Sequence, residues 1–514
     1  DGTNAAWNAF DADLYQFVTV NSDPNGQSAW AINCGQQPFR FDVPAGYNTL
    51  QCRNLAAATF PDPGVAFRTV FSSATGVAPG TAGAGNWSPY LYSSTEAFQG
   101  GTRGSAFNGV LTGEGNSVAA NSNAAGTTLR FAPASGVTFT GNLEVAISSN
   151  NSATFSGVTT NATSNFGFTQ ISTATGEVNQ FNPIVINTTL AGSAEPTLSA
   201  IRINGTTILR DIALLDYAQS VFPSGLWWTK AMSVANQHQL VDSVRGQDGA
   251  GDWQALTMPT NNAEQDYVAP LTGGTSNAPA EEVAWCWNFN ATNPATNGFQ
   301  IITETGNQTQ RAINHDLGKP PEWIIAKSVT AAAATCVFHE AIGAGGGIFL
   351  NDPGATDPRT IFWGGVEPTN TQFTVGTSEA TNPSNETVYY VWTSVSGYSA
   401  MGSYTGNGAQ DTNGPYNYTG FSPMWVMLKS TSDSRPWMIY DTIRDPTNFN
   451  GRNLIASSTA VQADNTGAVI DILSNGFKAR GGVDQVNANG ETYIWIAYAQ
   501  FPFGGDNVQP ANAR

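Results

Sequence analysis

Residues 420–429 read Gly-Phe-Ser-Pro-Met-Trp-Val-Met-Leu-Lys, and Trp-Met-Ile-Tyr-Asp follows at 437–441. Short apolar runs on either side of a polar stretch predict two β-strands joined by a loop. Two earlier stretches have the same layout, 222–230 followed by 239–242 and 319–327 followed by 337–340. The chain therefore carries one structural unit three times.

Each copy of the unit has a lysine in its first strand and a carboxylate in or just after its second. The intervals are 12, 13 and 12 residues for Lys230 to Asp242, Lys327 to Glu340, and Lys429 to Asp441. We interpret these as cross-strand pairs, worth about 0.2–1 kcal/mol each. A catalytic role is disfavoured, since an active site is seldom triplicated along one chain.

The composition indicates a multi-domain all-β protein. A chain of 514 residues exceeds one ordinary hydrophobic core. Only 11% of residues are charged, against about 25% in typical domains, and short strand-like runs alternate with Gly, Asn and Pro turns. The net charge of −18 disfavours binding to nucleic acid, because phosphate repels acidic surfaces. The sequence has no apolar run of about 20 residues, so we expect no membrane insertion.

The order of the patterns divides the chain into several β-sandwich domains, with jelly-roll or SPRY-like character, and their connections. We expect the end of a β-domain at 1–55, a Gly/Ala/Ser-rich connector at 56–105, a β-sandwich at 106–211, three copies of the repeated unit at 212–297, 298–396 and 397–504, and a tail at 505–514. The Asn204-Gly205 pair predicts a tight hairpin turn. The repeat period is near 100 residues, which suits tandem sandwiches or one sandwich built from duplicated parts.

Three segments resemble proteins of marine phages. Asn33-Cys34-Gly35-Gln36-Gln37-Pro38-Phe39 and the Pro44–Tyr47 turn resemble the end of SPRY-like domains in phage structural proteins. The strand order from Ala106 to Gly205 is similar to a sandwich module of such proteins. Residues 217–503 resemble a domain of unknown function in tail and virion proteins, those of cyanophages above all. The resemblance implies a virion protein that associates with other virion proteins and with copies of itself, as a homotrimer by analogy.

The sequence offers no strong catalytic or metal-binding pattern. His238, His315 and His339 lack a partner at zinc-like spacing. Glu281 and Glu282 are adjacent on an expected strand and point to opposite faces, so they cannot form a glycosidase pair by themselves. We therefore expect no enzyme, no metal and no cofactor. The turns at 23–26 and 484–490 are rich in oxygen-bearing side chains, and a bound calcium ion there is an open alternative. A disulfide between Cys34 and Cys52 is also left open.

Four aromatic residues in or beside loops of the third copy are candidate glycan contacts: Tyr416, Tyr418, Trp437 and Tyr440. Tyrosine and tryptophan combine a flat apolar ring with a polar edge, which suits stacking on sugars. The alternative is that these rings fill the core of a sandwich.

The expected function is that of a phage virion structural protein, a tail fibre, appendage or surface-decorating subunit that attaches to host-surface glycan. One alternative is a capsid- or tail-stabilising component without receptor binding. Another is a secreted bacterial protein that binds or hydrolyses polysaccharide. If a binding site exists, we expect it where the copies differ, as in 410–418 and 445–452, since their shared residues form the frame.

Overall fold

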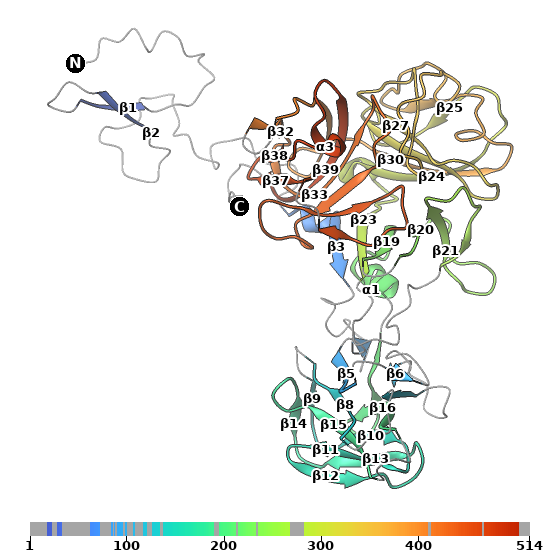
Figure 1. Cartoon of the computed structure of the whole chain (residues 1–514). Helices are drawn as coiled ribbons and strands as arrows, with labels where there is room; N and C mark the ends of the chain where they lie inside the picture. Colours follow the sequence, from blue (N-terminus) through green and yellow to red (C-terminus); the bar gives the residue numbers. More distant parts are fainter. Residues whose placement is uncertain are drawn as a thin grey trace.

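The computed structural model describes an all-β chain with three short helices among its described residues (Figure 1). The residues described are 18–22, 28–32, 62–71, 84–85, 87, 90–95, 98–99, 106–107, 117–120, 126–133, 137–189, 195–211, 214–232, 235–267, 282–409, 413–464 and 467–502. Strands β1 (Val18–Ser22) and β2 (Ser28–Ile32) pair as an isolated hairpin. The rest of residues 1–55, including Cys34 and Cys52, lies outside the described residues, as does the tail at 505–514.

A β-sandwich forms one separate lobe, at the bottom of Figure 1. Its first sheet has the order β13-β10-β16-β7-β6, with β17 beside β16, and its second has the order β12-β11-β15-β8-β5. The bounds are β5 (Leu91–Ser93), β6 (Phe98–Gln99), β7 (Val118–Ala120), β8 (Thr128–Phe131), β10 (Leu143–Ile147), β11 (Asn151–Phe155), β12 (Val158–Asn161), β13 (Phe168–Ser172), β15 (Ile184–Thr188), β16 (Thr197–Ile203) and β17 (Thr207–Ile208). Strands β9 (Val137–Phe139) and β14 (Gly176–Val178) pair at one side, and β4 (Ala84–Gly85) pairs with β18 (Arg210–Asp211). Most strands of this sandwich lie within 106–211, where a sandwich was expected, and Asn204 and Gly205 take the positive φ angles that a tight hairpin turn needs.

The segment expected to be an irregular connector, 56–105, contains strands, which corrects that prediction. Strands β5 and β6 belong to the sandwich, and β3 (Phe67–Phe71) pairs with β23 (Glu282–Asn288) of the first repeated unit. Phe67 faces Trp287 across a sequence separation of more than 200 residues. Periodicity within a short window cannot reveal such a pairing. The sandwich is thus inserted between the first and second strands of the first copy.

The three copies each build a main antiparallel sheet with the same strand order. The first copy has β3-β23-β19-β20-β21-β22, with β19 (Gly225–Ala231), β20 (His238–Asp242), β21 (Gln254–Met258) and β22 (Gln265–Asp266). The second has β24-β30-β26-β27-β28, with β24 (Phe299–Thr305), β30 (Glu386–Trp392), β26 (Trp323–Ser328), β27 (Cys336–His339) and β28 (Ile348–Phe349). The third has β31-β39-β33-β34-β35-β36, with β31 (Ser399–Thr405), β39 (Thr492–Pro502), β33 (Phe421–Ser430), β34 (Met438–Asp441), β35 (Arg452–Ile455) and β36 (Ala463–Asp464).

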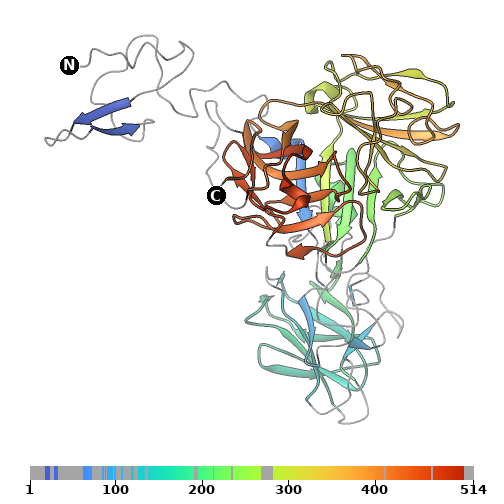
Figure 2. The ribbon, with the colours of Figure 1, turned by 45° about the horizontal axis from the view of Figure 1, so that its top comes forward.

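The three main sheets share one central core, and we call the whole assembly, 62–71 with 214–502, the hub. One face of every sheet contributes to this core, as with Leu226, Trp323 and Trp425, which hold equivalent register positions in the three copies. Trp287 of the first copy lies 6.0 Å from Trp392 of the second and 5.8 Å from Trp425 of the third, between ring centroids. The sheets therefore close on one another within a single chain (Figure 2).

The outer face of each main sheet is covered by a different layer. Helix α1 (Leu214–Val221) covers the first copy. Strands β25 (Arg311–Asn314) and β29 (Gln372–Val375) cover the second, and β32 (Tyr416–Tyr418), β38 (Gly476–Ala479), β37 (Ile470–Leu473) and helix α3 (Asp484–Asn487) cover the third. Helix α2 (Pro294–Asn297) connects the first copy to the second. Because both faces of the central strands are buried, their sequences are continuous apolar runs without alternation.

Candidate functional sites

The three repeated lysines are buried and are bonded to backbone carbonyl groups. Nζ of Lys230 donates to the carbonyl oxygens of Ala231 at 2.7 Å and of Thr459, in the third copy, at 3.3 Å. Nζ of Lys327 donates to Ala333 at 2.7 Å and reaches Thr260 of the first copy at 3.5 Å. Burial lowers the pKa of both ammonium groups to about 8. Lys230 and Lys327 thus join neighbouring copies.

The lysines do not face the carboxylates with which the sequence paired them, which corrects the expectation of cross-strand pairs. The register sets Leu226 opposite Asp242 and Trp425 opposite Asp441, so each lysine lies four residues further along its strand. The reason is that the hairpin turn is centred closer to the lysine than to the carboxylate. In the second copy, His339 holds the position of the two aspartates. Glu340 is the residue after strand β27.

Each of the two aspartates, Asp242 and Asp441, binds an arginine of its own copy and an aromatic residue of another copy. Asp242 Oδ2 accepts hydrogen bonds from Arg245 Nε at 2.6 Å and from Tyr390 Oη, in the second copy, at 2.7 Å. Asp441 Oδ2 is bonded to Arg444 Nε and accepts from Trp285 Nε1, in the first copy, at 3.2 Å. A buried carboxylate is stable only when such donors surround it.

The third interface, between the second and third copies, has different residues at every one of these positions. His339 replaces the aspartate and Ile342 stands three residues later, where the other copies have an arginine. The position that faces it, equivalent to Tyr390 and Trp285, is Ile496, which has no donor. His339 Nε2 instead lies 3.2 Å from the carbonyl oxygen of Trp495. At this interface the aspartate is therefore absent together with the arginine and the aromatic donor that would bind it.

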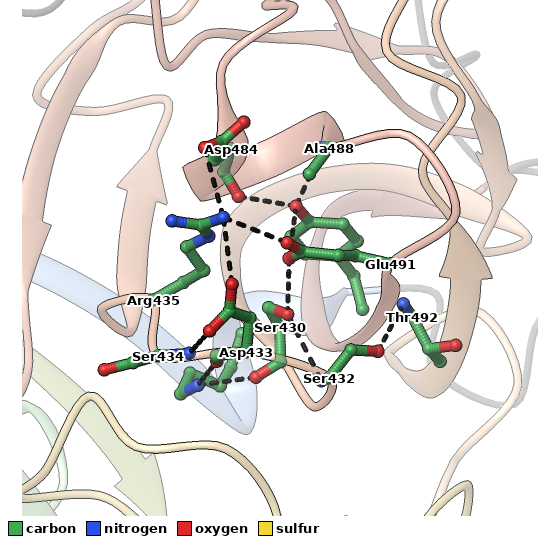
Figure 3. A network of polar contacts seen from close by, with 11 residues as sticks. Ser430, Ser432, Asp433, Ser434, Arg435, Asp484, Ala488, Glu491 and Thr492 are labelled. Carbon is green, nitrogen blue, oxygen red and sulfur yellow. Dashed lines mark hydrogen bonds and ion pairs between the residues drawn. The ribbon is translucent and has the colours of Figure 1, made fainter.

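A network of polar groups lies at one end of the third copy (Figure 3). Nζ of Lys429 donates to the carbonyl oxygens of two of its residues, Ser430 and Asp433. Arg435 Nη2 lies 3.2, 3.1 and 3.0 Å from carboxylate oxygens of Asp433, Asp484 and Glu491. Glu491 also accepts from Ser430 Oγ at 2.8 Å. Because these contacts join β33, α3 and the start of β39, the network fixes the packing of the third copy. The oxygen-rich turn at 484–490, a possible calcium site from sequence, forms part of it.

The histidines have structural partners. Trp228 Nε1 donates to His238 Nδ1 at 3.0 Å, and His238 Nε2 lies 3.0 Å from the carbonyl oxygen of Ile455. His315 Nε2 lies 3.0 Å from the carbonyl oxygen of Thr369. Burial lowers the pKa of His238 well below its usual value and that of His339 to about 4. Among the described residues, no three His, Cys, Asp or Glu side chains gather as metal ligands do.

Two glutamates meet at one end of the second copy. The Glu340 backbone N–H donates to the Glu322 carbonyl oxygen at 2.8 Å, and the Glu322 carboxylate accepts from Ser394 and Thr393. Burial, together with the Glu322 carboxylate, raises the pKa of Glu340 to about 7. Glu282 points into the protein, and burial raises its pKa to about 8. Glu281 lies outside the described residues.

The four candidate glycan contacts separate into two groups. Trp437 and Tyr440 are buried: Trp437 Nε1 donates to the carbonyl oxygen of Phe349 at 2.7 Å, and Tyr440 Oη to that of Ala468 at 3.0 Å. Both are core residues, which corrects their inclusion among surface contacts. Tyr416 and Tyr418 are 47% and 62% exposed. The alternation along β32, with Asn417 buried between them, places both tyrosines on the solvent face.

Sequence reasoning missed the arginine of the interface contact. Its signal is the pattern Asp-x-x-Arg, present at 242–245 and 441–444 and absent from the second copy. It also missed Phe181, which is 97% exposed on the sandwich. In the region that the structure describes, no helix has the length and apolar character needed to span a membrane.

One comparison with known protein families gives a match over most of the hub. Residues 204–502, more than half of the chain, match a family model described as Domain of unknown function (DUF7483). No curated protein matches the chain. Strand β3, which completes the first copy, precedes the matched residues. The chain belongs to the DUF7483 family, whose matched region comprises nearly the whole of the three-copy hub.

Proposed function

We propose that this protein is a structural subunit of a phage particle, in a tail fibre, appendage or surface decoration, and that it takes part in attachment to the host cell. The observation that carries the proposal is that one closed frame holds a different module at the same point of each copy. Between the first and second strands of the main sheet, the first copy inserts the sandwich, the second β25, and the third β32. Frames that hold variable elements suit recognition.

The ionisable groups of the frame support a structural role. Asp242, Asp441 and the three lysines bond to the hub itself. They are buried, and some of their partners lie in a neighbouring copy: Tyr390, Trp285, Thr260 and Thr459. A catalytic group would need contact with a substrate-sized pocket. This arrangement stabilises a rigid body, and we therefore propose no enzymatic activity.

Two measurements test the proposal. Protein analysis of purified particles from the source virus, with gold-labelled antibody on intact particles, is expected to find the chain on the particle exterior. Purified protein added to host cells is expected to reduce particle adsorption in proportion to its concentration. Absence of the chain from the particles would refute the structural role, and presence without any competition would refute the attachment role.

One observation favours a second candidate, a particle-stabilising subunit without receptor binding. Phe181 is held outward by a rigid turn, in which Asn179 Oδ1 accepts from the N–H groups of Phe181 and Asn182 at 2.9 Å each, and Arg130 Nη2 donates to the carbonyl oxygen of Gln180 at 2.8 Å. A fixed, fully exposed phenylalanine suits insertion into an apolar pocket of another particle protein. In that case Phe181→Ser would reduce incorporation of the subunit into particles, with Val158→Ser as the exposed apolar control.

A further inference from the structure

The solvent face of β32 presents two tyrosine rings in a row. Tyr416 and Tyr418 are two residues apart on one strand, so their Cα atoms are separated by ~7 Å. Lys478 lies opposite Tyr416 on the neighbouring strand, and Gly476 lies opposite Tyr418. Burial raises the pKa of Tyr416, and the nearby Tyr418 hydroxyl raises it further, which indicates that the two side chains lie close together.

Each ring lies against a glycine. A Cβ atom added to Gly476 would stand 3.2 Å from Cε2 of Tyr416, and one added to Gly420 would stand 3.6 Å from the hydroxyl of Tyr418 and 3.8 Å from its ring. The Tyr416 hydroxyl reaches the carbonyl oxygen of Asn475 at 3.4 Å, at the turn before β38. Both tyrosine rings therefore come close to the backbone at these glycines, and a large part of each side chain is exposed to solvent.

The second copy provides an internal comparison. Its outer strand β25 pairs with β29 as β32 pairs with β38, and Phe373 corresponds to Phe477. The positions equivalent to Tyr416, Tyr418 and Gly476 are then Ala312, Asn314 and Gln372. There Gln372 Nε2 donates to Asn314 Oδ1 at 2.8 Å, so the side chains bond to each other. The aromatic face is not required by the frame and is specific to the third copy.

We propose that Tyr416 and Tyr418 form a binding platform for a glycan of neutral hexopyranose units, a proposal that rests on the attachment function above. The C–H face of a pyranose ring stacks on an aromatic ring, and two rings in a row match consecutive sugars of one chain. Hydroxyl groups at the sugar edge meet the Tyr418 hydroxyl and the Lys478 ammonium group. An acidic glycan is disfavoured because the protein has a net charge of −18.

The test is binding of the full chain to an array of neutral hexose oligosaccharides that includes cellohexaose, maltohexaose and mannohexaose. The double variant Tyr416→Ala/Tyr418→Ala is expected to lose about tenfold or more in affinity for the glycan that the unaltered protein binds. The control is Tyr92→Ala, an exposed tyrosine on the sandwich, which is expected to change nothing. The reciprocal variant Ala312→Tyr/Asn314→Tyr/Gln372→Gly is expected to raise affinity by creating a second platform.

The possible outcomes separate this proposal from the attachment function. Loss of binding in the double variant alone supports the platform. Unchanged glycan binding in the double variant overturns the platform and leaves attachment standing. If no array glycan binds while the protein still competes with particles for cells, the glycan assignment is overturned alone. If the protein neither binds glycans nor competes, both proposals fall.

Discussion

Tyr390 Oη donates a hydrogen bond to Asp242 Oδ2 over 2.7 Å, and both residues are buried between the first and second copies. The same carboxylate accepts from Arg245, which also reaches the tyrosine hydroxyl at 3.2 Å. One buried ion pair thus fixes two β-sheets that are far apart in sequence. The equivalent contact, with Trp285 as donor to Asp441, joins the first copy to the third.

We predict that Tyr390→Phe lowers the free energy of unfolding by about 1–3 kcal/mol, because Asp242 loses a donor in a buried position. The control is Tyr389→Phe on the same strand, whose hydroxyl donates to the neutral carbonyl oxygen of Thr381 at 2.6 Å. Its removal is expected to cost less, about 1 kcal/mol. Denaturant titration of both variants measures the difference. Equal costs would show that the contact with the carboxylate carries no special stability.

At the interface of the second and third copies, we predict that His339→Asp is destabilising by about 3 kcal/mol or more. The new carboxylate would be buried opposite Ile496 with no arginine three residues later. Adding Ile342→Arg and Ile496→Tyr recreates the residues of the Asp242 contact and is expected to recover part of the loss. Thermal unfolding of the single and triple variants measures both effects. A His339→Asp variant as stable as the unaltered protein would contradict the interpretation of this position.

The second copy should become less stable between pH 5 and pH 8 because of Glu340. Its folded pKa of about 7 lies above the ordinary value of 4.5, so its stabilising contribution is complete below about pH 4.5 and is lost as the pH rises through 7. Glu340→Gln removes the cost of burying the ionised carboxylate and the repulsion from Glu322. We expect it to stabilise the protein at pH 8 by on the order of 1 kcal/mol, after discounting for solvent screening, and to have little effect at pH 5. A benefit independent of pH would argue against this explanation.

Lys230 should make the free energy of unfolding increase with pH in the alkaline range, the opposite of the effect of Glu340. Burial lowers its pKa from 10.5 to about 8, so between these values the unfolded chain binds more protons, and stability rises with pH. We predict that the difference in unfolding free energy between the unaltered protein and Lys230→Met grows in favour of the unaltered protein from pH 8 to pH 10. Taking the difference between the two proteins removes the effect of cysteine and tyrosine ionisation. A constant difference would mean that the lysine does not titrate in this range.

Local patterns in the sequence were sufficient for the fold class, the Asn204-Gly205 turn and the threefold repeat. They failed where contacts join distant segments. Phe67 completes a sheet with Trp287 only because the sandwich is inserted between them. The interval between Lys230 and Asp242 recurs in the other copies and suggested that the two residues face each other. They do not, because the hairpin turn is centred closer to Lys230, and sequence spacing does not reveal where a turn is centred.

The sequence predicted only part of the candidate glycan site correctly, again because contacts between distant segments decide which aromatic rings are buried. Tyr416, Tyr418, Trp437 and Tyr440 look alike in sequence, since all four are aromatic residues near loops. Trp437 and Tyr440 are covered by the second copy and by the outer layer of the third copy, which only the assembled hub brings there. Gly476 lies close to Tyr416 because β32 pairs with β38, and the sequence does not reveal that pairing.

Hydrogen exchange followed by mass spectrometry, comparing the unaltered protein with Trp287→Ala, tests the shared core most directly. Trp287 contacts Trp392 and Trp425 in the other two copies, and loss of such a ring typically costs about 3–5 kcal/mol. If the three sheets form one cooperative unit, the amides of β19, β26 and β33 will all exchange faster, by about a hundredfold or more. Faster exchange confined to β19 and β23, with β26 and β33 unchanged, would show that the copies are independent domains.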